Sequence, residues 1–133
     1  MNDGRMAHIG LVTLVVRDYD EAIGFYVRAA GFRLVEDTLL DDKKRWVVLA
    51  PPGAGETCLL LALADTDGQR QRIGDQTGGR VCLFLMTDDF GRDYDRMRAA
   101  GVRFREKPRR EPYGTVAVFE DLYGNQWDLI EQA

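Results

Sequence analysis

Few side chains in this 133-residue sequence have the chemistry that a catalytic centre needs. His8 is the only histidine, which argues against a Ser-His-Asp or Cys-His arrangement and favours a strand-end or surface position. Cys82 would need a base or cation to act as a nucleophile, and Arg80 is the nearest cation; the alternative is a buried, inert thiol. Asp128 in an apolar cleft would have a raised pKa and would act as a general base.

The composition of the chain indicates which kinds of molecule this protein is expected to bind. The chain has 18 Lys and Arg against 22 Asp and Glu, and a net charge of −4 disfavours nucleic acid. Its apolar runs fall short of the roughly 20 residues that span a bilayer, and residues 1–10 lack the apolar core of a signal peptide. We therefore expect a cytoplasmic protein with no nucleic-acid or membrane partner. Cys58 and Cys82 lie in apolar, strand-like runs, which favours buried reduced thiols over a disulfide.

The first half of the chain begins with a β-branched apolar run, residues 9–16, which predicts a buried strand. Asp18 and Glu21 have the spacing of a capping box at the start of a helix. Apolar residues then recur at helical spacing until Gly31, which ends the helix. Three further strands are predicted over 32–38, 45–50 and 57–63.

The second half predicts the same order of elements. An apolar strand over 81–86 precedes Asp88 and Asp89, which can cap a helix that Gly101 ends. The remaining strands are predicted over 102–105, 115–119 and 126–130.

A single offset relates the two halves. Gly31 and Gly101 are 70 residues apart (101 − 31), and each follows the pair Ala-Ala. The sequence therefore predicts an α+β fold, with tandem βαβββ modules at about 7–64 and 80–132 in one domain spanning 1–133. A polar, glycine-containing linker over 65–79 joins them.

Two segments resemble the glyoxalase/bleomycin-resistance/dioxygenase (vicinal oxygen chelate) superfamily. Residues 15–32 resemble its first strand and helix, with Val-Val-Arg-Asp followed by Phe25-Tyr26 and Gly31-Phe32. Residues 121–131 resemble its closing D-x-x-G-N-x-x-x-L turn and strand. The resemblance implies a curled, U-shaped mixed sheet with helices on the outer face and a cleft inside. It also implies a homodimer, with each cup formed within one chain or across two.

Metal-dependent members of this superfamily share four ligand positions, usually His, Glu or Gln. The resemblance places them at Leu11, in the apolar run 59–62, near Cys82 and at Asp128. Leucine cannot coordinate an ion, and a site of only Cys82 and Asp128 would be weak. We therefore expect no metal and no cofactor. This departure removes the main argument for a lactoylglutathione lyase or a ring-cleaving dioxygenase, since both use the ion as a Lewis acid.

The cleft itself remains as a binding site. Alternate residues of a strand share one face. Thr13 is therefore predicted to share a face with Leu11, Phe84 with Cys82 and Arg80, and Gln126 with Asp128. An apolar wall with a few polar groups is typical of a ligand pocket, although the same side chains could fill the space between the sheets. The predicted ligand-binding residues are Leu11, Thr13, Leu61, Arg80, Cys82, Phe84, Tyr113, Gln126 and Asp128.

Aromatic residues offer further contacts to a planar ligand. Trp46, Tyr113 and Trp127 are candidates, but Trp127 neighbours Asp128 and should face a helix instead. The basic loop 108–114, which contains Tyr113, is either a lid over the cleft or a plain connection.

Three hypotheses for function follow. The first is a metal-free protein that sequesters a small apolar or aromatic compound, as antibiotic-binding members of the superfamily do. The second is a lyase or dioxygenase, either metal-dependent or using Asp128 as general base. The third is a stand-alone module with a vestigial pocket.

Overall fold

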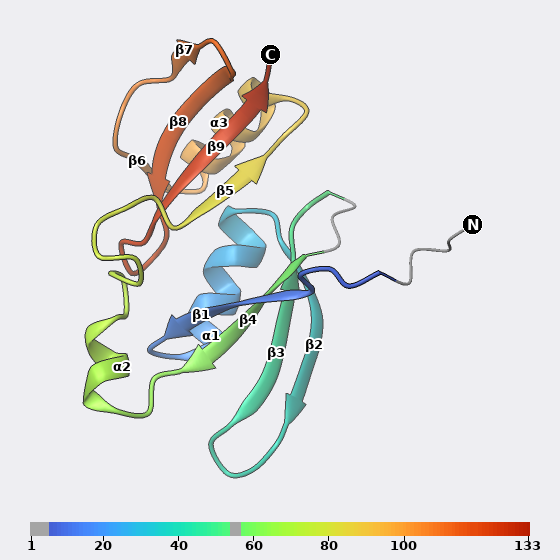
Figure 1. The fold of residues 1–133 in the computed structure, drawn as a ribbon, viewed down its shortest axis with the longest axis vertical. Helices are drawn as coiled ribbons and strands as arrows, with labels where there is room; N and C mark the ends of the chain where they lie inside the picture. The colour runs from blue at the N-terminus through green and yellow to red at the C-terminus, as the bar shows by residue number, and fades with distance from the viewer. Residues whose placement is uncertain (1–5, 54–56) are drawn as a thin grey trace.

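The first half of the chain forms a four-stranded mixed sheet with helices on one face (Figure 1). The structure, a computed structural model, describes residues 6–53 and 57–133; the first five residues of the predicted N-terminal segment 1–10 lie outside it. The strand order is β1-β4-β3-β2, with β1 parallel to β4 and the other pairs antiparallel. The elements are β1 (Leu11–Val16), α1 (Tyr19–Gly24), the π-helix η1 (Phe25–Ala29), β2 (Arg33–Leu39), β3 (Arg45–Ala50) and β4 (Cys58–Leu63).

The second half repeats this arrangement. Strands pair in the order β5-β9-β8-β6, a further short strand, β7, pairs with β8, and the helix α3 lies behind β8 and β9 in Figure 1. Two mixed sheets with few helices confirm the predicted α+β fold class. The elements are β5 (Leu83–Met86), α3 (Phe90–Ala99), β6 (Arg103–Phe104), β7 (Arg109–Glu111), β8 (Gly114–Glu120) and β9 (Gln126–Gln132).

The first helix begins where the sequence predicts, but its capping box is only half formed. The Asp18 carboxylate accepts a hydrogen bond from the Glu21 N–H at 2.9 Å. The Glu21 carboxylate pairs with Arg17 instead of returning to the cap, and the Asp18 N–H lies 3.3 Å from the Tyr123 hydroxyl. The long side chain of Arg17, which directly follows β1, thus competes successfully for the glutamate.

Glycine ends the same helix for a steric reason. Gly31 has φ +78°, and a Cβ there would lie 2.1 Å from the Arg96 guanidinium of α3. The positive φ is the conformation that glycine adopts without strain, whereas the flexible end of the Arg96 side chain could move aside. Glycine therefore terminates the helix through its backbone conformation.

Two short elements were missed at the sequence level. The helix α2 (Asp67–Gln71) lies in the predicted linker, capped by the Thr66 hydroxyl, which accepts from the Gln69 N–H at 3.1 Å. The strand β7 lies in the predicted loop 108–114 and pairs only with β8. Neither element buries a continuous apolar face, so hydrophobic periodicity gives no signal for either. Within residues 6–53 and 57–133, no helix has the length and apolar character that crossing a bilayer requires.

The helix-facing side chains of both sheets join in one hydrophobic core. Leu14 and Val16 of β1 are fully buried on the first sheet, and Leu129 of β9 is fully buried on the second. Tyr26, Phe32 and Trp127 form an aromatic contact between the halves, with the Tyr26 and Trp127 ring centroids 5.8 Å apart. The two modules are therefore held together by apolar packing.

A buried hydrogen-bond network crosses the same contact. The Tyr26 hydroxyl donates to Asp121 Oδ2 at 2.7 Å and accepts from Trp127 Nε1 at 3.1 Å. Burial, and after it the adjacent Asp121 carboxylate, raises the pKa of Tyr26 well above 10.0, so the hydroxyl stays a proton donor. Asp121 also accepts from Asn125 Nδ2 at 2.9 Å, which fixes the turn between β8 and β9.

The linker supplements this contact at the edge of the first sheet. The side chain of Gln76 accepts from the Val15 N–H at 2.8 Å and donates to the Thr13 carbonyl at 2.6 Å. One amide group thereby satisfies backbone polar groups on the open edge of β1, as a neighbouring strand would.

We expect Tyr26→Phe to lower the free energy of unfolding by about 1–3 kcal/mol, because it leaves buried Asp121 and Trp127 polar groups without their partner. Urea unfolding measures the change. Tyr94→Phe is the matched control, since among described residues the partly buried Tyr94 hydroxyl makes no hydrogen bond and its loss should change stability by less than about 0.5 kcal/mol. Equal effects of the two variants would contradict this role of Tyr26.

Candidate functional site

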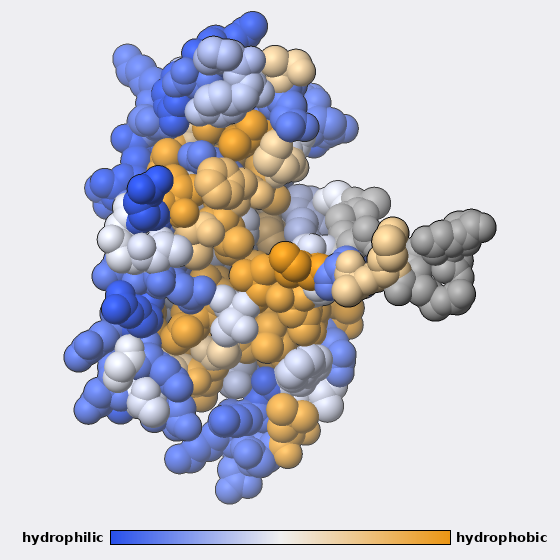
Figure 2. All heavy atoms as spheres, in the orientation of Figure 1, coloured by the Kyte–Doolittle hydropathy of each residue, from blue (hydrophilic) through white to orange (hydrophobic). Residues whose placement is uncertain are grey.

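Each sheet has a second face that no helix covers. On β1 the side chains of Leu11, Thr13 and Val15 point to this open face, while their neighbours enter the core. Figure 2 shows apolar residues gathered along the middle of the near face, with hydrophilic residues around them. The open faces therefore supply the apolar surface that a ligand or a partner would cover.

A hollow of about 390 Å³ lies on the open face of the first sheet. Thr13 and Val15 of β1 stand opposite Leu60 and Ala62 of β4, and Trp46 of β3 lies beside them with 37% of its surface exposed. The volume falls within the range of small-molecule pockets. The rim adds polar groups from the β2–β3 hairpin and from the linker, namely Lys44, Arg45, Asp65 and Gln69.

Leu60 and Leu61 of β4 both line this hollow. The side chain of Leu61 is 1% exposed and packs in the core, whereas Leu60 shares a face with Thr13. The run 58–63 is apolar throughout, so it has no alternation from which the outward residues could be predicted. Leu11 lies on the open face with 39% of its surface exposed.

Asp128 occupies the open face of the second sheet. It is only 8% exposed and stands between Phe84 of β5 and Val118 of β8 in the strand register. Its Oδ1 atom is buried without a hydrogen-bond partner among the described residues. Burial raises the pKa of Asp128, nearby Arg109 opposes this shift, and Glu106 adds to it.

Arg109, the cation that influences the pKa of Asp128, is bound by other groups. Arg109 Nε donates to Glu106 at 3.1 Å, and its Nη1 atom donates to Glu111 and, at 3.3 Å, to the Tyr113 hydroxyl. Glu106 in turn accepts from the Val118 N–H at 3.1 Å. These contacts hold the guanidinium to segment 106–113 instead of to Asp128.

The other predicted site residues do not form one cluster. The Cys82 N–H donates to the Gln126 carbonyl at 2.7 Å, which places these two residues side by side at the base of the second sheet. Burial, followed by the Asp121 carboxylate, raises the pKa of Cys82, which opposes a reactive thiolate. Arg80 is exposed and so is His8, which precedes β1; Tyr113 is 52% exposed.

The donor set does not suit a divalent ion. Leu11 and Leu60 present hydrocarbon on the first sheet, and Asp128 on the second is flanked by Phe84 and Val118. Within residues 6–53 and 57–133, no three His, Cys, Asp or Glu side chains lie close enough to hold a metal. These residues therefore do not supply the set of ligands that the metal site of this fold requires.

A larger hollow of about 530 Å³ lies between the modules and was not anticipated from the sequence. Its charged side chains pair with one another, since Arg92 binds Asp88 at 2.8 Å and both Arg92 and Arg96 approach Asp93. A hollow lined by paired charges is less suited to an apolar guest than the hollow beside Trp46.

Comparison with known proteins agrees with this architecture. A family model for the Glyoxalase/Bleomycin resistance protein/Dioxygenase superfamily matches residues 5–129. The chain belongs to this superfamily. An uncharacterized protein of Shewanella frigidimarina (strain NCIMB 400) is 57% identical over 121 residues, which cover 90% of this chain and 90% of that protein.

Solved structures of the superfamily are also similar. A member from Sphaerobacter thermophilus DSM 20745 is 32% identical with a TM-score of 0.79, covering 96% of this chain and 98% of its own. TnmS3, an antibiotic binding protein from Streptomyces sp. CB03234, is 29% identical with a TM-score of 0.78, covering 97% of this chain and 98% of its own. The resemblance inferred from the sequence is thus confirmed at the level of the superfamily.

The raised pKa of Asp128 predicts a pH dependence of stability. Its protonated form is favoured in the folded state, so its contribution is complete below the ordinary value of 3.8 and is lost as pH rises through the raised value. Relative to Asp128→Asn, the wild-type protein should therefore gain stability as pH falls from neutrality towards 3.8. Urea unfolding at a series of pH values measures the difference; a difference that is constant with pH would contradict the assignment.

Proposed function

We propose that this protein binds and sequesters a small apolar or aromatic compound without the help of a metal ion. The apolar hollow beside Trp46, lined by Thr13, Leu60 and Ala62, carries this proposal. Apolar area there supplies affinity, while the rim's few polar side chains orient the guest. The similarity to TnmS3, described as an antibiotic binding protein, supports a ligand of this kind.

The position of Trp46 favours planar guests. Its ring is 37% exposed on the open face of β3, across the sheet from Leu60 and Ala62. An indole supplies a broad, rigid contact surface at low entropic cost, and offset stacking on an aromatic ligand adds about 0.5–1.5 kcal/mol.

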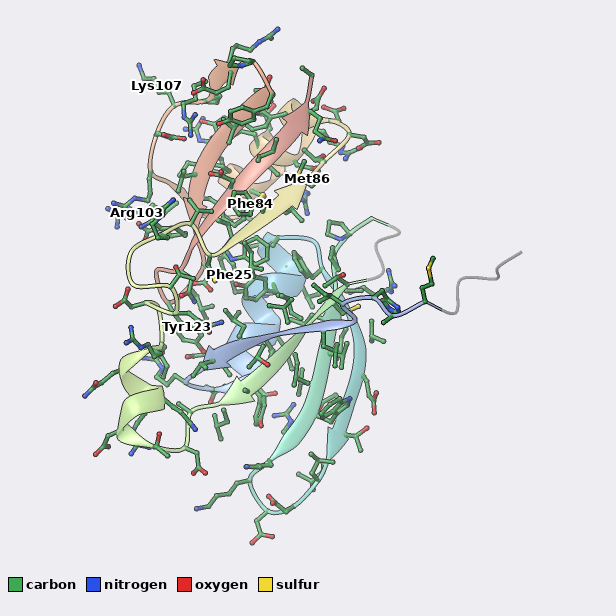
Figure 3. All side chains as sticks on the ribbon, viewed as in Figure 1. Phe25, Phe84, Met86, Arg103, Lys107 and Tyr123 are labelled. Atoms are coloured by element: carbon green, nitrogen blue, oxygen red, sulfur yellow. The ribbon has the colours of Figure 1, made fainter. Side chains whose placement is uncertain are left out.

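We propose that the functional unit is a cytoplasmic homodimer with clefts closed by open sheet faces. Figure 3 shows Phe84 and Met86 along β5, and they are 58% and 51% exposed. Leu11, at the edge of the first sheet, adds to this apolar surface. Exposed apolar side chains gathered on one face are typical of surfaces that bind a partner.

A second candidate function is catalysis with Asp128 as general base. The raised pKa of Asp128, caused mainly by burial, favours this alternative, because a higher pKa makes a carboxylate a stronger base. Turnover of a bound compound that stops in Asp128→Asn while binding of a neutral ligand persists would identify the protein as an enzyme.

The binding hypothesis predicts that a library of apolar and aromatic compounds contains ligands that raise the melting temperature. A ligand at 100 times its Kd stabilises the folded state by about 2.7 kcal/mol. Ala62→Trp should abolish these shifts, because the added indole fills the hollow. Val35→Trp, a change at a position on β2 that is 53% exposed, is the matched control and should leave the shifts intact.

Loss of the shifts in both tryptophan variants would point to general destabilisation, which circular dichroism of the unliganded variants detects. Absence of any hit in the wild-type protein would favour a vestigial pocket.

Divalent ions should have no specific effect. Zn²⁺, Mn²⁺, Ni²⁺ and Mg²⁺ are each expected to leave the melting temperature of the wild-type protein unchanged, since Leu11 and Leu60 supply no donor atoms. Elemental analysis of purified protein provides a second measurement. One equivalent of a tightly held ion, lost in Asp128→Asn, would reject the metal-free proposal in favour of a metal-dependent lyase or dioxygenase.

A further inference from the structure

The apolar hollow beside Trp46 continues into a second, smaller hollow. This smaller hollow, of about 220 Å³, is formed by the β2–β3 turn and the end of β4. Lys44 and Asp65 line both hollows. The strands β3 and β4 are antiparallel, with Val47 opposite Leu61, so the start of β3 and the end of β4 meet at one end of the sheet. A guest that lies against Trp46 therefore reaches one cationic and one anionic side chain.

These two charged side chains have no ionic partner in the described part of the chain. Of the charged residues on the rim, only Arg45 forms ion pairs with described residues, to Asp37 at 2.6 Å and to Asp20 at 3.0 Å. Two carboxylates thus compensate the charge of Arg45. Lys44 and Asp65 are both exposed, and water solvates them in the free protein. Their opposite charges are therefore available to a guest.

Hydrogen bonds fix the backbone from which each of the two side chains extends. The Lys44 N–H donates to Asp41 Oδ1 at 2.8 Å, and the Lys44 carbonyl accepts from the Leu40 N–H at 2.8 Å, which closes the turn. The Asp65 N–H donates to Gln69 Oε1 at 2.6 Å. Because both segments are ordered in the free protein, binding costs less backbone entropy.

We propose that the guest of this hollow is an aromatic amino acid in its zwitterionic form. This inference rests on the proposed binding function and names the chemistry of the compound. The aromatic ring stacks on Trp46, the carboxylate pairs with Lys44, and the ammonium group pairs with Asp65. An α-amino acid carries both charges on one carbon atom next to its side chain, which matches a rim with one available charge of each sign.

The charge balance of the rim disfavours guests with a single charge. An aromatic anion would bring its carboxylate towards Asp65, and an aromatic cation would bring its ammonium group towards Lys44. The other charged residues of the smaller hollow do not alter this balance, because Lys43 and Asp41 have opposite signs. The Asp41 carboxylate already accepts from the backbone N–H groups of Lys43 and Lys44.

Three probes with the same ring test the inference. L-Tryptophan carries both charges, tryptamine lacks the carboxylate, and indole-3-propionate lacks the ammonium group. In calorimetric titrations of the wild-type protein, we expect the Kd of L-tryptophan to be about fivefold lower than that of either analogue, which is the effect of one exposed ion pair.

Each charge is tested by its own substitution. Lys44→Ala should abolish the preference for L-tryptophan over tryptamine and keep the preference over indole-3-propionate. Asp65→Asn should do the reverse. Both side chains are exposed, so neither change disturbs the core. Asp42→Asn in the β2–β3 turn and Lys107→Ala in the second module remove charges that line neither hollow, and these controls should keep both preferences.

Salt dependence gives an independent measurement. Raising NaCl to about 1 M shortens the Debye length to about 3 Å. Both preferences should then decrease, while contact of the ring with the apolar wall persists. Preferences that do not change with salt would show that shape, instead of charge, discriminates between the probes, and the inference would fail.

The outcomes distinguish this inference from the proposed function. Equal binding of all three probes to the wild-type protein would overturn the roles of Lys44 and Asp65 and leave apolar sequestration intact. Retention of both preferences in Lys44→Ala or in Asp65→Asn would also overturn them. Binding of none of the probes would reject an aromatic amino acid as the guest, whereas library hits that Ala62→Trp abolishes would still support the proposed function.

Discussion

Helices cover only one face of each sheet, and this constraint determines what every strand residue does. On β1, Leu14 enters the core while Thr13 faces outward, and on β9 Leu129 enters the core while Asp128 faces outward. A strand places successive side chains on opposite faces, so burying one set fixes the position of the other. The hydrophobic packing that stabilises the fold therefore also builds the surface on which a ligand binds.

An aromatic contact shared by both modules helps to fix the relative position of the two sheets. Tyr26 comes from the first module and Trp127 and Asp121 from the second, and their hydrogen bonds lie inside the common aromatic cluster. Apolar packing gives such a contact strength, and buried hydrogen bonds give it a single geometry. The open faces keep a fixed relation because the helix-facing sides are joined in this way.

Two buried carboxylates in this protein differ in whether their oxygens have hydrogen-bond partners. Asp121 accepts hydrogen bonds from Tyr26 and from Asn125 and fixes a turn. Asp128 has an oxygen without a partner, on the face that helices leave open. A structural role explains the first carboxylate, and no such role is seen for the second among the described residues. Strain and unmet polar groups persist in proteins mainly where function requires them.

Local signals in the sequence were sufficient for much of the architecture. Asp18 and Asp89 cap the helices that they precede, and the repeated Ala-Ala-Gly marks both helix ends. Capping, glycine conformation and apolar alternation act over a few residues, so they can be read without the fold. The prediction against histidine-based catalysis and the lack of a donor atom at Leu11 likewise rest on residue identity alone.

Tertiary structure decided the remaining questions. The outward position of Leu60 in place of Leu61 depends on the register between β4 and β1, because an all-apolar strand carries no alternation of its own. Asp128 has no ion pair with Arg109 because Arg109 binds three groups of its own segment instead. The conformation of that segment determines this pairing. Sequence determines which side chains exist and how adjacent ones alternate, while long-range packing determines which of them meet.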